Sequence, residues 1–113
     1  AAGGSGSSTG DRSMTMNILA RKGAVSNELR KPGHVIPIEA VSGGILERQG
    51  HTEAGVELVK LAGISPAVAV DLEILDTDGN MASREYLFQM AKKFELKIIN
   101  IDQIISYVRE RTG

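Results

Sequence analysis

The sequence contains no cysteine and no tryptophan, and it has only two phenylalanines and two tyrosines. The absence of cysteine excludes disulfides, thiolate metal sites and thiol catalysis, and it fits a cytoplasmic protein. Because aromatic residues are scarce, a packed core has to be built mainly from aliphatic side chains.

Excess charge and long apolar runs are also missing. The 13 Lys and Arg residues nearly balance the 14 Asp and Glu residues, and no basic run is interleaved with aromatic residues. This composition argues against a general nucleic-acid binder and against a protein that binds membranes. No apolar run reaches the roughly 20 residues that a membrane-spanning helix requires. The N-terminus lacks the charged and apolar segments of a signal peptide.

A chain of 113 residues is at most one small domain, or a piece of a larger one. Residues 1–8 read AAGGSGSS, a composition typical of a flexible leader or an engineered linker. We therefore expect the folded portion to be residues 9–113.

Apolar residues repeat with a helical period in four stretches of the chain. Each stretch begins at a polar residue that is well suited to open a helix, namely Asp11, Thr52, Ser83 and Asp102. The period of the last stretch places Ile104, Ile105 and Val108 on the inner face.

The second of these helices is the best defined. Thr52 is expected to cap it, and Gly63 is expected to end it. The helical period places Ala54 and Leu58 on the buried face and Glu53 on the exposed face.

Three short segments have the composition of strands, at residues 35–38, 68–75 and 96–100. Residues 76–79, DTDG, are expected to form a turn after the second of them. Strands that alternate with helices predict an α+β fold, with a mixed sheet and helices packed on it in a three-layer α/β/α arrangement. Three strands are few for four helices, so we expect a partial domain.

Residues 43–52, GGILERQGHT, carry the strongest functional signal. Glycines let the backbone approach a ligand, and a helix N-terminus attracts anions. Arg48 and Thr52 flank His51, so a phosphate could meet a guanidinium, a hydroxyl and first-turn N–H groups together. The alternative is that Thr52 is only a cap, Arg48 a solvated charge and His51 a surface histidine. Spacing alone does not decide between these interpretations.

Glu73 is another candidate, because it lies near the end of an otherwise apolar predicted strand. A partly desolvated carboxylate at that place would suit proton transfer. The alternative is a solvated strand face that Asp71 and Glu73 share. His34, which follows a Pro-Gly pair, is a weak signal by itself.

Several motifs in succession resemble the 3,4-dihydroxy-2-butanone 4-phosphate synthase family. They are KPGHVIPI at residues 31–38, GGILERQGHTEA at 43–54, DGNMA at 78–82 and IDQII at 101–105. With Glu73 between them, the similarity covers roughly residues 9–110. Motifs that occur in the right order are far more specific than any one of them.

This resemblance implies a lyase of riboflavin biosynthesis that converts ribulose 5-phosphate into 3,4-dihydroxy-2-butanone 4-phosphate and formate. It also implies a homodimer and a pair of Mg²⁺ (or Mn²⁺) ions at each site. Enolisation of this substrate needs a base near a metal-polarised carbonyl. Carried over by motif, His34 and Glu73 would be catalytic, and His51 would be a metal ligand. The substrate-binding residues would be Arg48, Gln49, Gly50, His51, Thr52 and Glu73.

One part of the family pattern has no counterpart in this sequence. The family's N-terminal half carries an acidic loop with a metal-binding glutamate, so the chain resembles the C-terminal half alone. We expect weak or no catalysis by this chain by itself, because one histidine cannot hold two Mg²⁺ ions, which prefer oxygen ligands. Two other functions stay open. They are a non-catalytic fold fragment that self-associates through exposed sheet edges, and a phosphate-binding module.

Overall fold

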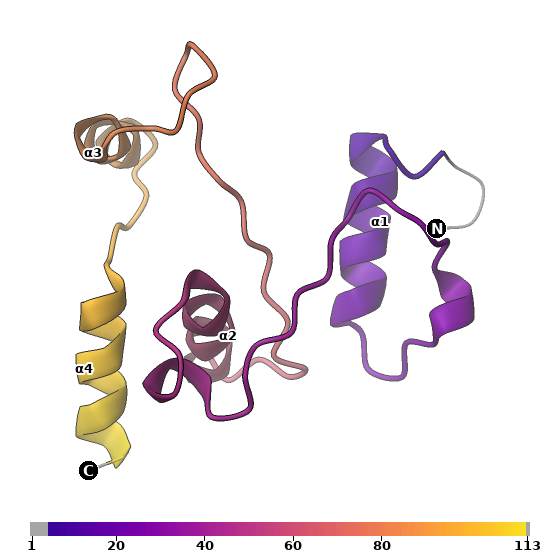
Figure 1. Ribbon diagram of the computed structural model, residues 1–113, viewed down its shortest axis with the longest axis horizontal. Coiled ribbons are helices and arrows are strands. Elements are labelled where there is room, and N and C mark those ends of the chain that lie inside the picture. The colour runs from indigo at the N-terminus through magenta and orange to yellow at the C-terminus, as the bar shows by residue number, and fades with distance from the viewer. Residues whose placement is uncertain (1–4, 113) are drawn as a thin grey trace. The chain divides into compact units, whose positions relative to one another are not determined.

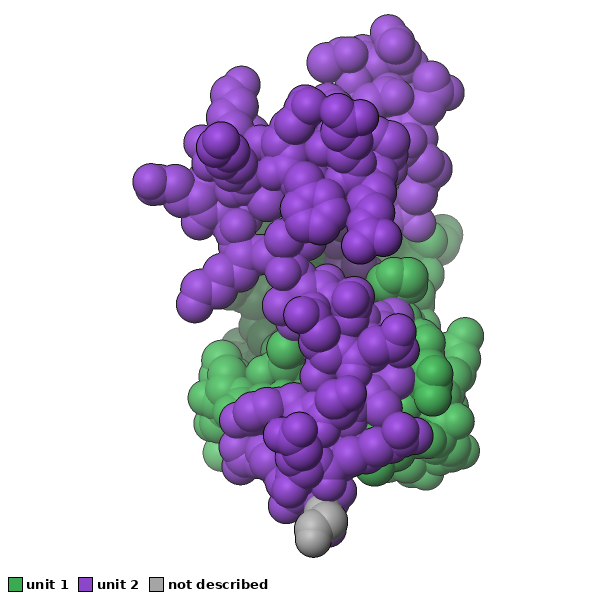
Figure 2. Space-filling model, turned by 90° about the vertical axis from the view of Figure 1, so that its left-hand side faces the viewer, with its two compact units in different colours: residues 1–70 green, residues 71–113 purple. Residues whose placement is uncertain are grey.

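The structure, a computed structural model, describes residues 5–112 (Figure 1). It divides into two compact units. The first unit spans residues 1–70 and the second spans residues 71–113, which Figure 2 shows in green and purple. Within the described range, none of the helices is long and apolar enough to cross a membrane.

The first helix of unit 1 is α1 (Thr9–Ala20). Its N-cap is Ser8, whose hydroxyl accepts a hydrogen bond from the Asp11 N–H at 3.0 Å. The prediction that Asp11 caps the helix is therefore wrong. Asp11 lies in the first turn, where its carboxylate accepts a hydrogen bond from the Gly6 N–H at 3.2 Å. Of the predicted leader, residues 5–8 thus lie against α1, and residues 1–4 lie outside the described range.

A short 3₁₀ helix, η1 (Ser26–Glu28), follows α1. The Glu28 carboxylate accepts hydrogen bonds from the Arg21 guanidinium and, at 2.9 Å, from the Val25 N–H. These two hydrogen bonds, chiefly the one from Arg21, hold the pKa of Glu28 below its usual value. The Arg21–Glu28 pair joins the end of α1 to η1.

The rest of unit 1 is built around α2 (His51–Leu61) and a 3₁₀ helix, η2 (Gly44–Leu46), which pack together. Ile45 of η2 is fully buried, and Ala54 in the first half of α2 is nearly so. These two residues form the small apolar centre of this part of the chain.

The chain passes close to α2 again after the helix ends. A Cβ added at Gly55 would lie 3.3 Å from the Ala69 Cβ, so a small residue is needed where the two segments approach. Gly63 follows the helix with a φ of +75°, which confirms the prediction that it ends α2.

Unit 2 begins its helical part with α3 (Arg84–Lys93). The Ser83 hydroxyl accepts a hydrogen bond from the Tyr86 N–H at 3.1 Å, so the predicted N-cap is confirmed.

The last helix is α4 (Ile101–Thr112). Asn100 and Gln103 close its start reciprocally, because each side-chain oxygen accepts a hydrogen bond from the other residue's N–H at 2.8 Å. The helix therefore begins one residue earlier than predicted. Its buried residues are those that the sequence predicted, Ile104, Ile105 and Val108.

The predicted mixed sheet is not present in the residues that the structure describes. Strand-like pairing there is limited to one antiparallel bridge, between Leu75 and Met81. The predicted turn lies between them and is confirmed. Its Asp76 carboxylate accepts hydrogen bonds from the N–H groups of Asp78 and Asn80, both at 2.9 Å.

The three predicted strand segments are irregular and expose apolar side chains. Ile36 is 82% exposed and Leu72 is 76% exposed. A strand forms only when a second strand supplies hydrogen-bond partners, and helices or loops separate these segments along the chain. The alternation of apolar residues therefore indicated which side chains could face a sheet, but it could not show whether a partner strand was present.

Two neighbouring residues of η2 test the importance of the Ile45 contact. We expect Ile45→Ala to lower the free energy of unfolding by about 2–5 kcal/mol, because it empties a fully buried site. Leu46→Ala, at a residue that is 44% exposed, should cost less than about 1 kcal/mol. Urea unfolding monitored by circular dichroism measures both. Equal costs for the two variants would contradict the assignment of Ile45 to the core.

Candidate functional site

Residues 43–52 form a compact turn that leads into α2. Gly44 has a φ of +68°, a left-handed conformation that glycine adopts without strain. Its carbonyl accepts hydrogen bonds from the N–H groups of Glu47 and Arg48, both at 3.0 Å. The turn therefore carries Arg48 back toward the start of α2.

The first glycine pair of this segment accommodates carboxylates of the chain itself. The Gly43 N–H donates to Glu47 Oε2 at 2.8 Å, and a Cβ at Gly43 would overlap the Glu47 side chain. A Cβ at Gly44 would lie 3.3 Å from Glu57 Oε2. The need for glycine at these two positions thus has a local cause, independent of any ligand.

Glu53 is the most important residue of the segment for its shape. It lies in the first turn of α2 and is only 1% exposed, so the prediction that it faces solvent is wrong. Its Oε2 accepts a hydrogen bond from the Val41 N–H at 3.1 Å, and its Oε1 accepts one from Arg48 Nη1 at 3.3 Å. A buried carboxylate is stable only with such partners.

Arg48 is paired and exposed at the same time. Its guanidinium forms an ion pair with Glu53 at 3.3 Å, while 61% of its side chain remains exposed. A guanidinium has five N–H donors, and the contact with Glu53 is made through Nη1. Arg48 is therefore more than a solvated charge, and it keeps donors directed to solvent.

His51 and Thr52 are the first two residues of α2. The N-cap is Gly50, which has no side chain to cap the helix, so the prediction that Thr52 is the cap is wrong. The helical hydrogen bonds begin with the Ala54 N–H donating to the Gly50 carbonyl at 3.0 Å. The N–H groups before Ala54 have no intrahelical acceptor, as at any helix start.

The structure thus brings the predicted substrate-binding residues of unit 1 into one short turn. His51 and Gln49 are exposed, and Thr52 is half-buried. Together with the first-turn N–H groups and the exposed part of Arg48, they offer hydrogen-bond donors to an anion.

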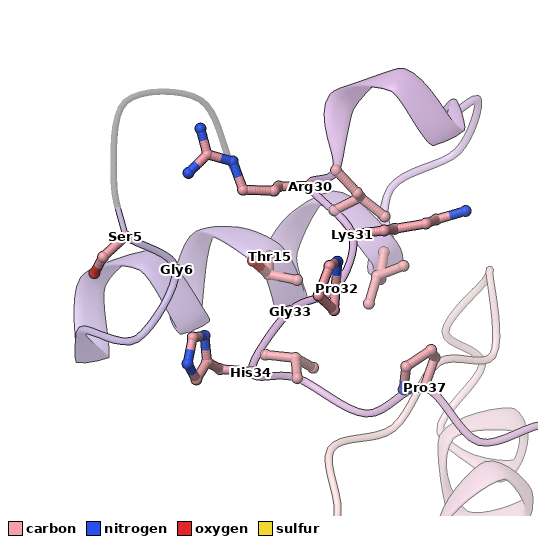
Figure 3. A pocket seen from close by; sticks show the side chains of 12 residues that line it. Ser5, Gly6, Thr15, Arg30, Lys31, Pro32, Gly33, His34 and Pro37 are labelled. Carbon is pink, nitrogen blue, oxygen red and sulfur yellow. The ribbon is translucent and has the colours of Figure 1, made fainter.

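His34 lies in a separate groove of unit 1, with a volume of about 300 Å³. Figure 3 shows its imidazole beside the segment that carries Gly6, and a Cβ at Gly6 would lie 3.5 Å from His34 Nδ1. The groove is lined by residues of α1, residues 5–6, residues 29–35 and Pro37, and none of residues 48–52 is among them.

Glu73 belongs to unit 2, where it is exposed. The partial desolvation that would suit it to proton transfer is not present in the structure. Its predicted catalytic role stays a prediction.

The residues that the structure describes do not by themselves fit a pair of magnesium ions. Among residues 5–112, no group of three or more His, Cys, Asp or Glu side chains could hold a metal ion. His51 offers a single nitrogen, whereas Mg²⁺ prefers near-octahedral oxygen ligands.

Comparison with known proteins identifies the family of this chain. The family described as 3,4-dihydroxy-2-butanone 4-phosphate synthase matches residues 2–107. The chain belongs to this family. The match confirms the resemblance that the sequence motifs indicated.

Curated relatives of the family show the same similarity over nearly the whole chain. The riboflavin biosynthesis protein RibBA of Endomicrobium trichonymphae is 45% identical over 95% of this chain. The monofunctional riboflavin biosynthesis protein RIBA 2, chloroplastic, of Arabidopsis thaliana is 44% identical over 94% of it. The chain spans only 26% and 23% of these two relatives, so it corresponds to a part of each.

Solved structures of the family have a similar backbone. A two-domain synthase from A. baumannii has a TM-score of 0.86 and 39% identity, and the alignment covers 92% of this chain and 31% of that one. A synthase solved in complex with two magnesium ions has a TM-score of 0.76 and 34% identity, and the alignment covers 91% of this chain and 52% of that one. The family fold is therefore present here in part.

Glu53 is the residue of the site that sequence reasoning missed. Helical periodicity predicts that Glu53 lies on the exposed face of α2 with Glu57 and Lys60. The period depends only on the helix itself, so it does not show that a loop covers the first turn. The available signal was a glutamate three residues after an N-cap, a position that often bonds backbone N–H groups. Here the bonded group is the Val41 N–H, which lies 12 positions earlier in the chain.

Gly50 provides a direct test of the Glu53 position. A Cβ at Gly50 would lie 2.7 Å from Glu53 Oε1, which cannot shift without loosening its bonds to Val41 and Arg48. We expect Gly50→Ser to destabilise the protein by about 1–3 kcal/mol, although serine is favoured at an N-cap. Urea unfolding of this variant and the wild type measures the difference.

The matched control is Gly10→Ser in α1, where the added Cβ would lie 3.9 Å from the Ser8 Oγ and meet no clash. It should change stability by less than about 1 kcal/mol. A neutral or stabilising effect of Gly50→Ser would show that the Glu53 carboxylate is not held as described.

Proposed function

We propose that this chain is the C-terminal portion of a 3,4-dihydroxy-2-butanone 4-phosphate synthase. The enzyme converts ribulose 5-phosphate into 3,4-dihydroxy-2-butanone 4-phosphate and formate in riboflavin biosynthesis. The observation that carries the proposal is the turn of residues 48–52 at the N-terminus of α2, in a chain that matches the family over residues 2–107.

The substrate phosphate binds at this turn. Arg48 supplies most of the attraction, because a helix N-terminus contributes only about 0.3–1 kcal/mol to an anion at an exposed site. The N–H groups of His51 and Thr52 and the Thr52 hydroxyl orient the phosphate, and Gln49 and Gly50 line the same turn. The exposed donors of this turn support the assignment.

The divalent metal site is completed by a part of the synthase that lies outside this chain. His51 supplies one ligand to Mg²⁺ or Mn²⁺, and the oxygen ligands come from that other part. The relative solved with two magnesium ions supports a divalent metal in the family. We assign proton transfer to Glu73 and an essential role to His34 on the motifs that carry them.

The remaining part of the domain also supplies the missing strands. Residues 35–38, 68–75 and 96–100 then join a mixed sheet between helical layers, and the complete enzyme forms a homodimer. The exposed apolar side chains of these segments support this pairing. We expect the complete enzyme to be cytoplasmic, although the names of its plant relatives place those proteins in chloroplasts.

Formate release from ribulose 5-phosphate with Mg²⁺ tests the proposed reaction. We expect weak or no turnover by the 113-residue chain alone, and robust turnover when it is joined to the preceding part of a relative's synthase domain. In that joined protein, Arg48→Met should lower kcat/KM about 10–100-fold, because it removes charged hydrogen bonds to the phosphate. Removal of the metal with a chelator should abolish turnover.

The control for this measurement is Arg109→Met, which removes the same charge outside the residues that the family match covers. It should leave kcat/KM unchanged within about twofold. Robust turnover by the chain alone would contradict the assignment of the metal ligands. A joined protein that folds but releases no formate would contradict the proposed function.

A self-associating fold fragment is the second candidate, favoured by the apolar side chains exposed on the unpaired segments. Sedimentation of the chain alone distinguishes it, since a stable monomer counts against it. A phosphate-binding module is the third. Phosphate-dependent protection of the amides of residues 50–54 with no effect of Mg²⁺ would favour it.

A further inference from the structure

The two hydrogen bonds that Glu53 accepts have different roles. The Val41 N–H bond fixes the loop before η2 to the helix, and a neutral glutamine oxygen could accept it equally well. The Arg48 bond is an ion pair made by the second oxygen, Oε1, and a glutamine whose single oxygen bonds the Val41 N–H would turn its NH₂ group toward Arg48 instead. Only the second bond requires a carboxylate at this position.

Arg48 is long and mostly exposed, so an unheld guanidinium would sample many rotamers. An arginine side chain loses rotamer entropy when it becomes ordered, and a ligand that orders it has to overcome that loss. The Glu53 side chain is fully buried, and its Oε2 accepts a hydrogen bond from the Val41 N–H, so the position of its Oε1 is fixed. The ion pair therefore orders the guanidinium before any ligand arrives.

We infer that Glu53 is a positioning residue, which holds the Arg48 guanidinium at the N-terminus of α2 in readiness for the substrate phosphate. This inference rests on the proposed function only in naming the phosphate. The juxtaposition of Arg48, Gly50 and Glu53 supports it, because a Cβ at Gly50 would lie within 4 Å of both side chains.

If Glu53 acted only through its charge, removing that charge would have the opposite effect on phosphate binding. A carboxylate 3.3 Å from the guanidinium competes with a phosphate for it and repels the phosphate. Removing the charge of Glu53 would then tighten phosphate binding. If Glu53 acts by positioning, removing the charge weakens binding, because Arg48 becomes mobile.

The experiment measures the dissociation constant of inorganic phosphate from the amide shifts of residues 50–54 in the 113-residue chain. Glu53→Gln keeps the side-chain volume and an acceptor for the Val41 N–H. We expect it to raise the dissociation constant about 3–10-fold. The matched control is Glu57→Gln, which removes the same charge from the same helix one turn later. It should leave the constant unchanged or lower it slightly.

An unchanged or lowered constant for Glu53→Gln would overturn the inference. In an Arg48→Met background the effect of Glu53→Gln should vanish, since positioning acts through Arg48. A persisting effect in that background would also overturn it.

A second measurement tests whether Glu53 positions Arg48 if Glu53→Gln does not fold or if phosphate does not bind. The heteronuclear NOE of Arg48 Nε in the phosphate-free chain should be close to that of the α2 backbone. A value typical of a freely rotating side chain would overturn the positioning role. If this NOE is high and Arg48→Met leaves phosphate binding unchanged, the proposed phosphate site fails while the positioning of Arg48 stands.

Discussion

The carboxylate of Glu53 is the group on which the candidate site depends. A charge this deeply buried is tolerated only when its oxygens are hydrogen bonded, and here they bind the Val41 N–H and the Arg48 guanidinium. These bonds join the loop before η2, the turn of residues 43–50 and the first turn of α2. Gly50 lies where any side chain would collide with the carboxylate. The position of Arg48 next to Gly50, at the start of α2, follows from this one requirement.

The second constraint is the lack of pairing partners for the predicted strands. In the described residues their apolar side chains stay exposed, and pairing is limited to the bridge next to the Asp76 turn. The chain spans about half the length of a solved synthase and about a quarter of the curated relatives. Helices form in such a part because their hydrogen bonds are local, whereas a sheet needs strands that are distant along the chain.

Local signals in the sequence predicted part of the local structure. Ser83, Gly63 and the apolar face of α4 lie as predicted, because caps, helix ends and helical periodicity depend on neighbouring residues. Two caps were predicted wrongly, since Ser8 and not Asp11 caps α1, and Gly50 and not Thr52 caps α2. The predicted exposure of Glu53 is wrong for a tertiary reason, because a loop covers the first turn of α2. The motifs identified the family and predicted Arg48 to Thr52 as one candidate site. They could not show that Glu53 accepts hydrogen bonds from Val41 and Arg48, since Val41 is distant in sequence.

Hydrogen exchange at Val41 tests the central role of Glu53 most directly. The Val41 N–H lies outside every helix, and Glu53 Oε2 is its acceptor at 3.1 Å. The buried carboxylate predicts that this amide exchanges within about tenfold of the rates in the middle of α2. It also predicts that Glu53→Ala removes the protection at Val41. Exchange of the wild-type Val41 amide at the rate of an unprotected loop would contradict the account.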